Sequence, residues 1–323
     1  MHEGHQRLRL LGLPVFETIG DLAAQLHIDP GRLTILTRYG ERFYRTYRIP
    51  KRTGGWRQIS QPSRELKGIQ AWILRNIIDK LSPSPHATAY LPRKRLSDNV
   101  TPHSGNRYFL SVNLEEFFPS IPRRRIQRLF ELIGYERHTA ALMSSLCTFF
   151  RSLPQGGVTS PALSNLVALQ MDRRISGLVS RRNIVFTRYA DDMTFSSNNR
   201  VALIRALPSI KHILESEGFR INEPKTRFLG PRIQCRITGL VKDSSEPRFG
   251  IGRKKKTRMR AIMHNLITGK RRDPDYPSQE AIQGWLNFLK GVDEKSHSQM
   301  SKYWNQLRNK YFTIHRTTGS SVP

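Results

Sequence analysis

Two adjacent aspartates lie between two short runs of apolar and β-branched residues. Asp191 and Asp192 fall between residues 184–188 and residues 193–196, a pattern that predicts a β-hairpin with both carboxylates at its exposed tip. Carboxylate oxygens are the ligands that Mg²⁺ prefers, and two such ions about 3.5–4 Å apart catalyse phosphoryl transfer in many enzymes. Because Asp is common in ordinary turns, the pair alone does not establish this chemistry.

The elements that must position this pair follow from the hydrophobic periodicity. Residues 44–59 predict a hairpin, residues 108–114 predict a buried strand, and Ser63 is a candidate N-cap for a helix over residues 63–81. The remaining predictions are helices at residues 123–133, 139–151, 160–179 and 201–218, the last interrupted at Pro208, short strands at 219–221 and 236–240, and helices throughout from residue 253.

The composition favours a nucleic-acid partner. The 323 residues carry a formal net charge of +29, and a long polyanion suits this charge because each neutralised phosphate releases condensed counterions. An anionic membrane surface would favour one basic amphipathic helix, whereas Arg and Lys recur along the whole chain. No apolar run approaches the roughly 20 residues of a membrane span, and no secretory signal is present, so we expect a cytoplasmic protein without a membrane partner. Cys147 and Cys235 lack zinc or disulfide spacing and are expected to be buried, reduced thiols.

The tetrapeptide Tyr189-Ala190-Asp191-Asp192 resembles the catalytic box of reverse transcriptases, and other parts of that family's pattern occur in the expected order over about residues 45–240. The resemblance implies an α+β fold shaped like a right hand. Its fingers would be residues 1–105, its palm, with an antiparallel sheet, residues 106–240, and its basic helical thumb residues 241–323. It also implies an RNA-directed DNA polymerase that uses two Mg²⁺ ions and dNTP substrates.

The resemblance further implies roles for individual residues. Lys225 matches a lysine near the leaving pyrophosphate, and Phe118 matches the steric gate that rejects ribonucleotides, although without the motif it is as readily an ordinary core aromatic. Arg57 matches the residue that contacts the incoming triphosphate. The predicted nucleotide-binding residues are Arg57, with Lys51 or Arg52 as its helper, Phe118, and Gln155 and Gly156 in a loop whose glycines allow close backbone approach.

The third metal-binding aspartate of the family pattern corresponds to Asn113 in this chain. A neutral amide offers a carbonyl oxygen but no charge to offset two Mg²⁺ ions. Losing several kcal/mol of metal-assisted stabilisation would slow the chemistry by about 10²–10⁴. Asn113 is therefore interpreted as an engineered inactivating change or as a naturally dead or weakened site. Glu115 or Glu116 could offer a replacement carboxylate, but both are expected to point differently from Asn113.

Two short elements narrow the resemblance to retron reverse transcriptases. Residues 99–103, from Asn99 to His103, are similar to that group's Asn-Ala-x-x-His element, and Ile237-Thr238-Gly239 is similar to its Val-Thr-Gly element. The resemblance implies a structured noncoding RNA that supplies the template and an internal 2′-hydroxyl primer. The product would be a branched RNA–DNA hybrid (msDNA), paired with an effector protein in phage defence.

Predicted nucleic-acid-binding residues lie in the fingers and at the start of the thumb: Asn99, His103, Arg253, Lys254, Lys255 and Lys256. Taken alone, His103 is predicted to be a structural or RNA-packing residue rather than a catalyst, because no Ser or Cys partner accompanies it. Two alternatives stay open. One is a reverse transcriptase of another class, either intron-encoded or diversity-generating, and the other is a nucleic-acid-binding scaffold that lost turnover through Asn113.

Overall fold

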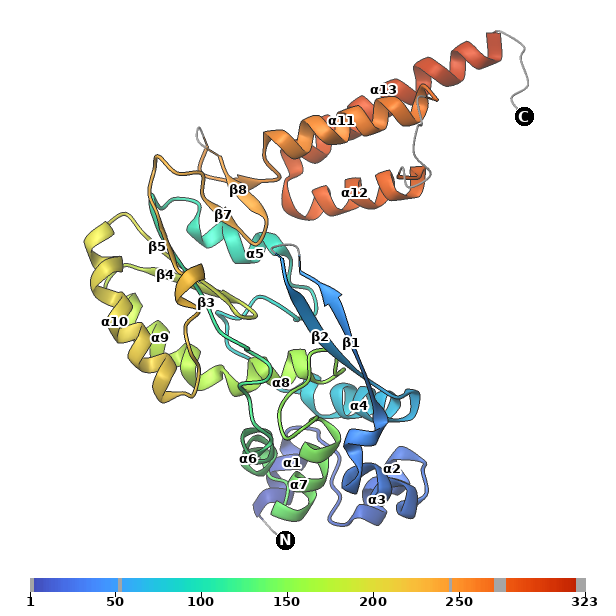
Figure 1. Ribbon diagram of the computed structural model, residues 1–323, viewed down its shortest axis with the longest axis vertical. Helices are drawn as coiled ribbons and strands as arrows, with labels where there is room; N and C mark the ends of the chain where they lie inside the picture. Colours follow the sequence, from blue (N-terminus) through green and yellow to red (C-terminus); the bar gives the residue numbers. More distant parts are fainter. Residues whose placement is uncertain (1–2, 52–53, 244–245, 270–276, 318–323) are drawn as a thin grey trace.

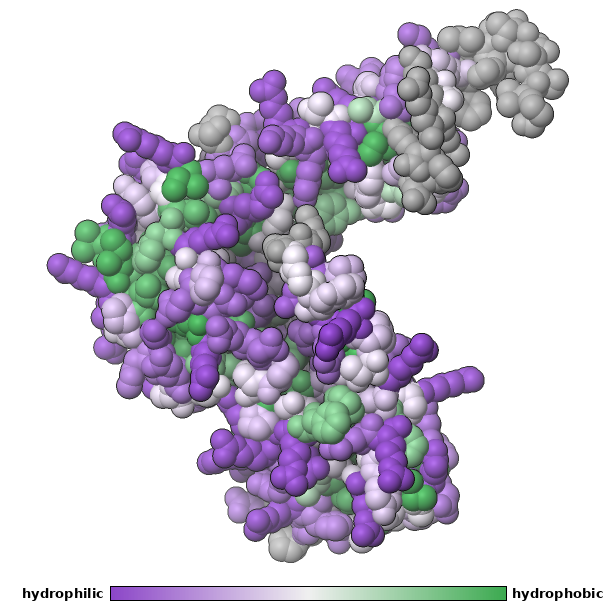
Figure 2. All heavy atoms as spheres, in the orientation of Figure 1, coloured by the Kyte–Doolittle hydropathy of each residue, from purple (hydrophilic) through white to green (hydrophobic). Residues whose placement is uncertain are grey.

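The computed structural model describes residues 3–51, 54–243, 246–269 and 277–317. Its elements are arranged as an open hand, with the N-terminal helices at one end, a sheet in the centre and the C-terminal helices projecting at the other end (Figure 1). The space-filling view shows a hollow between the C-terminal helices and the body of the molecule (Figure 2). Within the described ranges, no helix combines the length and apolar character needed to cross a membrane.

The central sheet has four antiparallel strands in the order β4-β5-β3-β6. Its strands are β3 (Tyr108–Asn113), β4 (Val185–Tyr189), β5 (Asp192–Ser197) and β6 (Arg227–Leu229). Strand β3 is largely buried on both faces, as predicted, and its register with β5 places Asn113 opposite Asp192. Helices α9 (Leu169–Ser180) and α10 (Arg200–Ser216) cover one face of the sheet (Figure 1).

The N-terminal part combines helices with the predicted hairpin. Strands β1 (Tyr44–Pro50) and β2 (Trp56–Pro62) pair antiparallel. Ser63 caps α4 by accepting a hydrogen bond from the amide of Leu66, which confirms the predicted helix start. The helices of this part and of the adjoining region are α1 (Glu3–Leu10), α2 (Ile19–Leu26), α3 (Pro30–Arg38), α4 (Arg64–Asn76), α5 (Leu96–Val100), α6 (Arg123–Ile133), α7 (Arg137–Leu146) and α8 (Ser160–Val167).

The C-terminal part has a hydrophobic core of its own, which includes Met263, Leu286 and Trp304. Val100 of α5 and Phe109 of β3 also belong to this core, so the C-terminal part packs against both α5 and β3. The elements of this part are β7 (Arg236–Ile237), β8 (Leu240–Lys242), β9 (Phe249–Gly250), α11 (Arg253–Ile267), α12 (Gln279–Val292) and α13 (Glu294–Thr317). The three-part division at residues 105 and 240 stays a proposal.

Four helix predictions were wrong in detail. Helix α10 continues through Pro208. Proline has no N–H to donate to the carbonyl of Ile204, four residues earlier. Ile204 is 46% exposed, so this carbonyl lies on the solvent side of the helix, where water can replace the missing donor. Residues 160–179 form two helices that meet at Ala168. The helices predicted to reach residues 81 and 151 end earlier, at Asn76 and Leu146.

Two strand predictions were also wrong in detail. Residues 219–221 contribute only an isolated bridge between Ile221 and Leu114. Residues 236–240 contain a turn between β7 and β8, where Thr238 and Gly239 have φ values of 45° and 84°. Glycine tolerates this left-handed backbone readily, which explains a Gly at the second turn position.

Both cysteines are free and buried, as predicted. Burial raises the pKa of the Cys147 and Cys235 thiols to about 12, so both stay protonated at neutral pH.

Candidate catalytic site

The predicted hairpin forms, and its tip carries the two aspartates. Strand β4 ends at Tyr189, β5 begins at Asp192, and Ala190 between them has a φ of 57°. The backbone carbonyl of Asp191 accepts a hydrogen bond of 3.0 Å from the amide of Leu114. The turn that bears the carboxylates is therefore attached to the end of the neighbouring strand β3.

Asn113 joins the two aspartates directly. Its Nδ2 donates to Asp191 Oδ2 at 2.8 Å and to Asp192 Oδ1 at 2.6 Å. The side chain is 6% exposed, so the amide is held between the carboxylates in a largely buried position. Because ionised carboxylates only accept hydrogen bonds, the amide takes the place of a shared cation and partly offsets their mutual repulsion.

Lys225 approaches the same amide from the other side. Its Nζ donates to Asn113 Oδ1 at 3.3 Å, and the backbone amide of Asn222 donates to the Asn113 carbonyl at 2.7 Å. The short 3₁₀ helix Glu223–Lys225 starts immediately after Asn222 and sets the position of the lysine. Four of the predicted catalytic residues, Asn113, Asp191, Asp192 and Lys225, therefore form one hydrogen-bonded cluster.

The electrostatics of this cluster differ from those of an isolated turn. Partial burial, together with the nearby charge of Asp191, raises the pKa of Asp192, while the Asn113 hydrogen bond and the Lys225 charge act in the opposite direction. The repulsion between two close carboxylates favours the binding of a cation. Their oxygens suit Mg²⁺, whereas the amide Nδ2 does not ligate a metal.

The donor set fits a metal only in part. In the part of the chain that the structure describes, no three His, Cys, Asp or Glu side chains are grouped to hold a metal ion. Glu115 and Glu116 are exposed and do not complete such a group with Asp191 and Asp192. Asp191 and Asp192 could hold Mg²⁺, but the third carboxylate that a two-ion site needs is missing at position 113.

The predicted nucleotide loop lies against the β1–β2 hairpin. The amide of Ser60 donates to the Gln155 carbonyl at 2.7 Å, and a Cβ at Gly156 would lie 2.9 Å from the Ser60 carbonyl oxygen. Gly156 also has a φ of 115°, so only glycine fits this approach without strain. Arg57 and Lys51 are exposed on the same hairpin, and Arg52 lies outside the described residues.

Tyr90 is a residue of this region that sequence reasoning missed. Its side chain is 46% exposed, and its ring lies 6.2 Å from the Phe118 ring. Burial and the charges of Asp191, Tyr189 and Asp192 raise the pKa of Tyr90, whereas Arg57 lowers it. Tyr90 is therefore close enough to Arg57 and to the two aspartates for their charges to affect it. The segment around Tyr90 has no hydrophobic periodicity that would have singled it out in the sequence. Its exposure and its positive φ of 61° are visible only in the folded structure.

Asn99 and His103 lie inside the protein rather than on its surface. They are 1% and 0% exposed, and His103 contacts Ser196 Oγ at 2.6 Å and Thr187 Oγ1 at 2.9 Å. Asn99 accepts a hydrogen bond from Thr88 and donates to Thr238 Oγ1 at 3.5 Å. These contacts support a structural role, and contact with nucleic acid stays a prediction for both.

The basic run at the start of the C-terminal helices lies on the first turn of α11. Arg253, Lys254 and Lys255 are exposed, and Lys256 is half-buried. Lys255 donates to the carbonyl of Gly239 at 3.4 Å, next to the turn that also contacts Asn99. Arg253 and Lys254 are the most accessible of these side chains, and none of the four is part of the Asn113 cluster.

An antiparallel sheet with paired carboxylates at a hairpin tip, flanked by a two-stranded hairpin and a helical C-terminal part, defines the palm of a right-hand nucleic-acid polymerase. A structure of telomerase from Candida tropicalis with a fragment of telomeric RNA shares this fold, with a TM-score of 0.50 at 12% identity. That match covers 85% of this chain and 55% of the telomerase chain, so this chain spans about half of it, and the likeness concerns the fold alone.

Sequence comparisons identify the family. Residues 49–249 match the family described as reverse transcriptase (RNA-dependent DNA polymerase). The chain is 38% identical over 307 residues to the retron Ec86 reverse transcriptase of Escherichia coli, covering 94% of each chain. It is 32% identical over 319 residues to the retron Mx65 reverse transcriptase of Myxococcus xanthus, covering 92% of this chain and 73% of that one. The chain therefore belongs to the reverse transcriptases, a family of RNA-directed DNA polymerases, and within them to the retron type.

Proposed function

We propose that this protein reverse-transcribes a structured noncoding RNA, primed from an internal 2′-hydroxyl of that RNA, into a branched RNA–DNA hybrid. The hybrid, msDNA, would act with an effector protein in antiphage defence in the cytoplasm. The proposal is supported by similarity to retron reverse transcriptases over most of the chain. It is also supported by the contact between Asn99 and Thr238, which joins the two short elements that resemble retron enzymes.

Residues of several segments have separate roles in this proposal. Arg57 on β2 binds the triphosphate of the incoming dNTP, because a guanidinium donates paired hydrogen bonds to phosphate oxygens. Lys225 places a proton donor beside the leaving pyrophosphate. Phe118 and Tyr90 hold the sugar of the nucleotide between their rings and the palm. Asp191 and Asp192 would hold Mg²⁺, which when bound favours the attacking hydroxylate and offsets the charge of the triphosphate.

The proposal also holds that turnover in this chain is impaired. The hydrogen bonds from Asn113 to both aspartates are the observation that supports this part. An amide at this position occupies one acceptor site on one oxygen of each carboxylate and adds no negative charge. The chain would then bind RNA and dNTP but polymerise slowly, and a complete loss of turnover would leave an RNA-binding scaffold.

The experiment that tests the retron assignment uses the Asn113→Asp variant. This variant restores the missing carboxylate at position 113, so that slow polymerisation does not hide the DNA product. The variant is incubated with dNTPs and the RNA transcribed from DNA flanking its own gene. The proposal predicts DNA that stays covalently joined to RNA after denaturation and is released by a 2′,5′-debranching enzyme. Extension only from an added DNA primer would contradict it and favour another class of reverse transcriptase.

A further inference from the structure

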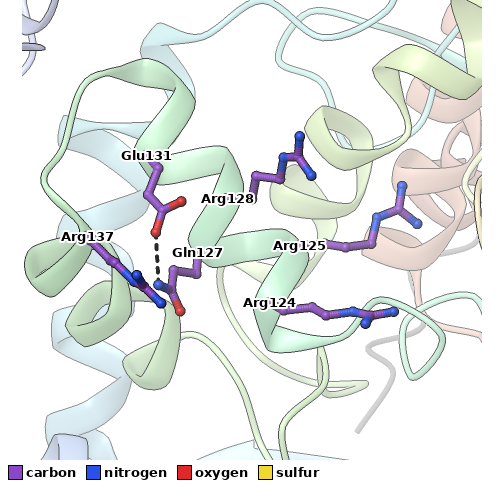
Figure 3. Close-up of a pocket in the computed structure, with 6 residues that line it drawn as sticks. All are labelled: Arg124, Arg125, Gln127, Arg128, Glu131 and Arg137. Atoms are coloured by element: carbon purple, nitrogen blue, oxygen red, sulfur yellow. Dashed lines mark hydrogen bonds between the residues drawn. The ribbon is translucent and has the colours of Figure 1, made fainter.

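A basic pocket lies outside the catalytic region, between α6 and α7. It has a volume of about 830 Å³ and is lined by Arg124, Arg125, Gln127, Arg128, Glu131 and Arg137. Figure 3 shows Arg124, Arg125 and Arg128 projecting to one side of α6, whereas Arg137, from α7, lies beside Gln127 on the other side of the helix. We call this set the α6 arginine pocket. We propose that it binds the phosphodiester backbone of a structured RNA, and the proposal rests on the function proposed above.

The charges of the pocket are unbalanced. In the described ranges, Arg124, Arg128 and Arg137 form no ion pair, and the only carboxylate in the lining, Glu131, accepts a hydrogen bond from Gln127 at 2.9 Å. Arg124 and Arg128 are four residues apart on one helix face, where like charges are destabilising. The first turn of α6 also lacks an acidic residue, although that end of a helix favours negative charge. An external anion would relieve this repulsion.

Arg125 differs from its neighbours because it is already fixed. Its Nη1 donates to the Glu217 carbonyl at 2.6 Å, and its guanidinium lies 5.0 Å from the centre of the Phe219 ring. Arg125 therefore forms the rigid wall of the pocket, and the other three arginines are the groups free to engage a ligand. Guanidinium groups suit phosphate because their N–H groups match two phosphate oxygens at once.

The lining favours a nucleic-acid backbone over a protein partner or a nucleotide. All six lining residues are polar or charged. Protein interfaces bind mainly through buried aromatic and apolar anchors, and a nucleotide base would need an aromatic face for stacking. Phosphate contacts need neither, because they depend on charge and on hydrogen-bond donors.

The position of the pocket indicates which part of the RNA would reach it. Helix α6 lies beside α1 and α7, at the end of the molecule away from the C-terminal helices (Figure 1). The hollow of the hand is bordered by those C-terminal helices (Figure 2). A short template–primer duplex in the hollow would not extend to α6. A long folded RNA could follow the basic surface to the pocket, which would add affinity only for the longer ligand.

The test compares two triple variants of the full chain. The pocket variant carries Arg124→Glu, Arg128→Glu and Arg137→Glu, and leaves Arg125 in place. The control carries Arg181→Glu, Arg200→Glu and Arg205→Glu, which are exposed arginines on α10 and next to α9, and which change the net charge equally. Both are measured against a short poly(rA)/oligo(dT) duplex and against the same duplex joined to a long hairpin RNA, after circular dichroism has shown that both variants are folded.

The proposal predicts that the pocket variant binds the long RNA about 10- to 100-fold more weakly than the control. The slope of log affinity against log salt concentration should fall by the amount expected for the loss of about three phosphate contacts. Binding of the short duplex should stay within about twofold of the control, since the cleft is unchanged. Equal losses of affinity for the long RNA in both variants would overturn the proposal. It would also be overturned if poly-glutamate, but not a second RNA, displaced a ligand bound at the pocket. Failure of the unaltered chain to bind the short duplex would instead count against the proposed function.

Discussion

The guanidinium of Arg188 forms two parallel hydrogen bonds with the carboxylate of Asp172, from Nε at 2.8 Å and from Nη2 at 2.7 Å, and neither side chain is exposed to solvent. The remaining Nη1 donates to Asn165 Oδ1 at 3.1 Å and to the Ala190 carbonyl at 3.2 Å. Through this one side chain, the turn that bears the aspartates is tied to α8 and α9.

Replacing Arg188 with Lys is expected to destabilise the protein by about 3 kcal/mol, because lysine keeps the charge but leaves part of the buried carboxylate unpaired. Chemical denaturation measures this difference. The control is Arg174→Lys, since Arg174 also pairs with a carboxylate, that of Glu217 at 2.7 Å, but is more exposed. The control should cost less than about 1 kcal/mol. Equal losses for both variants would show that the buried pair has no special role.

Because His103 is buried, we expect the free energy of unfolding to depend on pH in a specific way. Burial lowers its pKa to about 4, whereas an unfolded histidine titrates near 6.5. Thr187 Oγ1 donates to the Asn99 carbonyl, so it accepts from His103 Nε2, which leaves Nδ1 as the acceptor for Ser196. The neutral ring therefore fits its site, and the stability it provides is complete above the unfolded pKa and declines as the pH falls towards the folded pKa.

Between about pH 7 and pH 5, this one group should account for a loss of about 2 kcal/mol of unfolding free energy. Urea denaturation at both pH values, for the unaltered chain and for His103→Gln, measures its share. The glutamine variant does not titrate here, so its stability should fall less by about that amount. Parallel pH profiles for the two proteins would exclude a depressed histidine pKa.

Tyr90 is expected to contribute to nucleotide binding. In the Asn113→Asp background, Tyr90→Ala should raise the KM for dNTP about tenfold with a smaller change in kcat, because binding rather than the chemical step loses a contact. Steady-state incorporation kinetics measure both constants. Phe150→Ala is the matched control, since Phe150 is also an exposed aromatic residue with a positive φ of 43°. A similar KM change in both variants would place Tyr90 outside the nucleotide site.

The parts of the fold that sequence predicted best are those with strong local signals. The hairpin around Asp191 and Asp192 follows from two β-type runs, and the start of α4 follows from a capping serine. Contacts between distant segments could not be predicted in this way. Arg188 and Asp172 are charged residues that composition places at the surface, and only the packing of α9 against β4 makes their burial possible.

The candidate site shows the same division. The motif match indicated Asn113, Asp191, Asp192 and Lys225, and the fold brings them into one cluster. The direction of the Asn113 amide could not be read from the sequence, because it depends on the register of β3 with β5 and on the position of Lys225. Asn99 and His103 were predicted to bind nucleic acid, but their burial and hydrogen bonds depend on the β4–β5 surface beneath them.

The central claim is that this chain is a reverse transcriptase whose turnover is limited by the amide at position 113. The most direct test is incorporation of dTTP on poly(rA)/oligo(dT) with Mg²⁺, comparing the chain with its Asn113→Asp variant under conditions where both bind the duplex. We predict that the variant polymerises about 10²-fold faster or more, because the third carboxylate restores metal-assisted stabilisation. If both proteins bind the duplex and neither incorporates dTTP, or if both incorporate it equally, the account of Asn113 is contradicted.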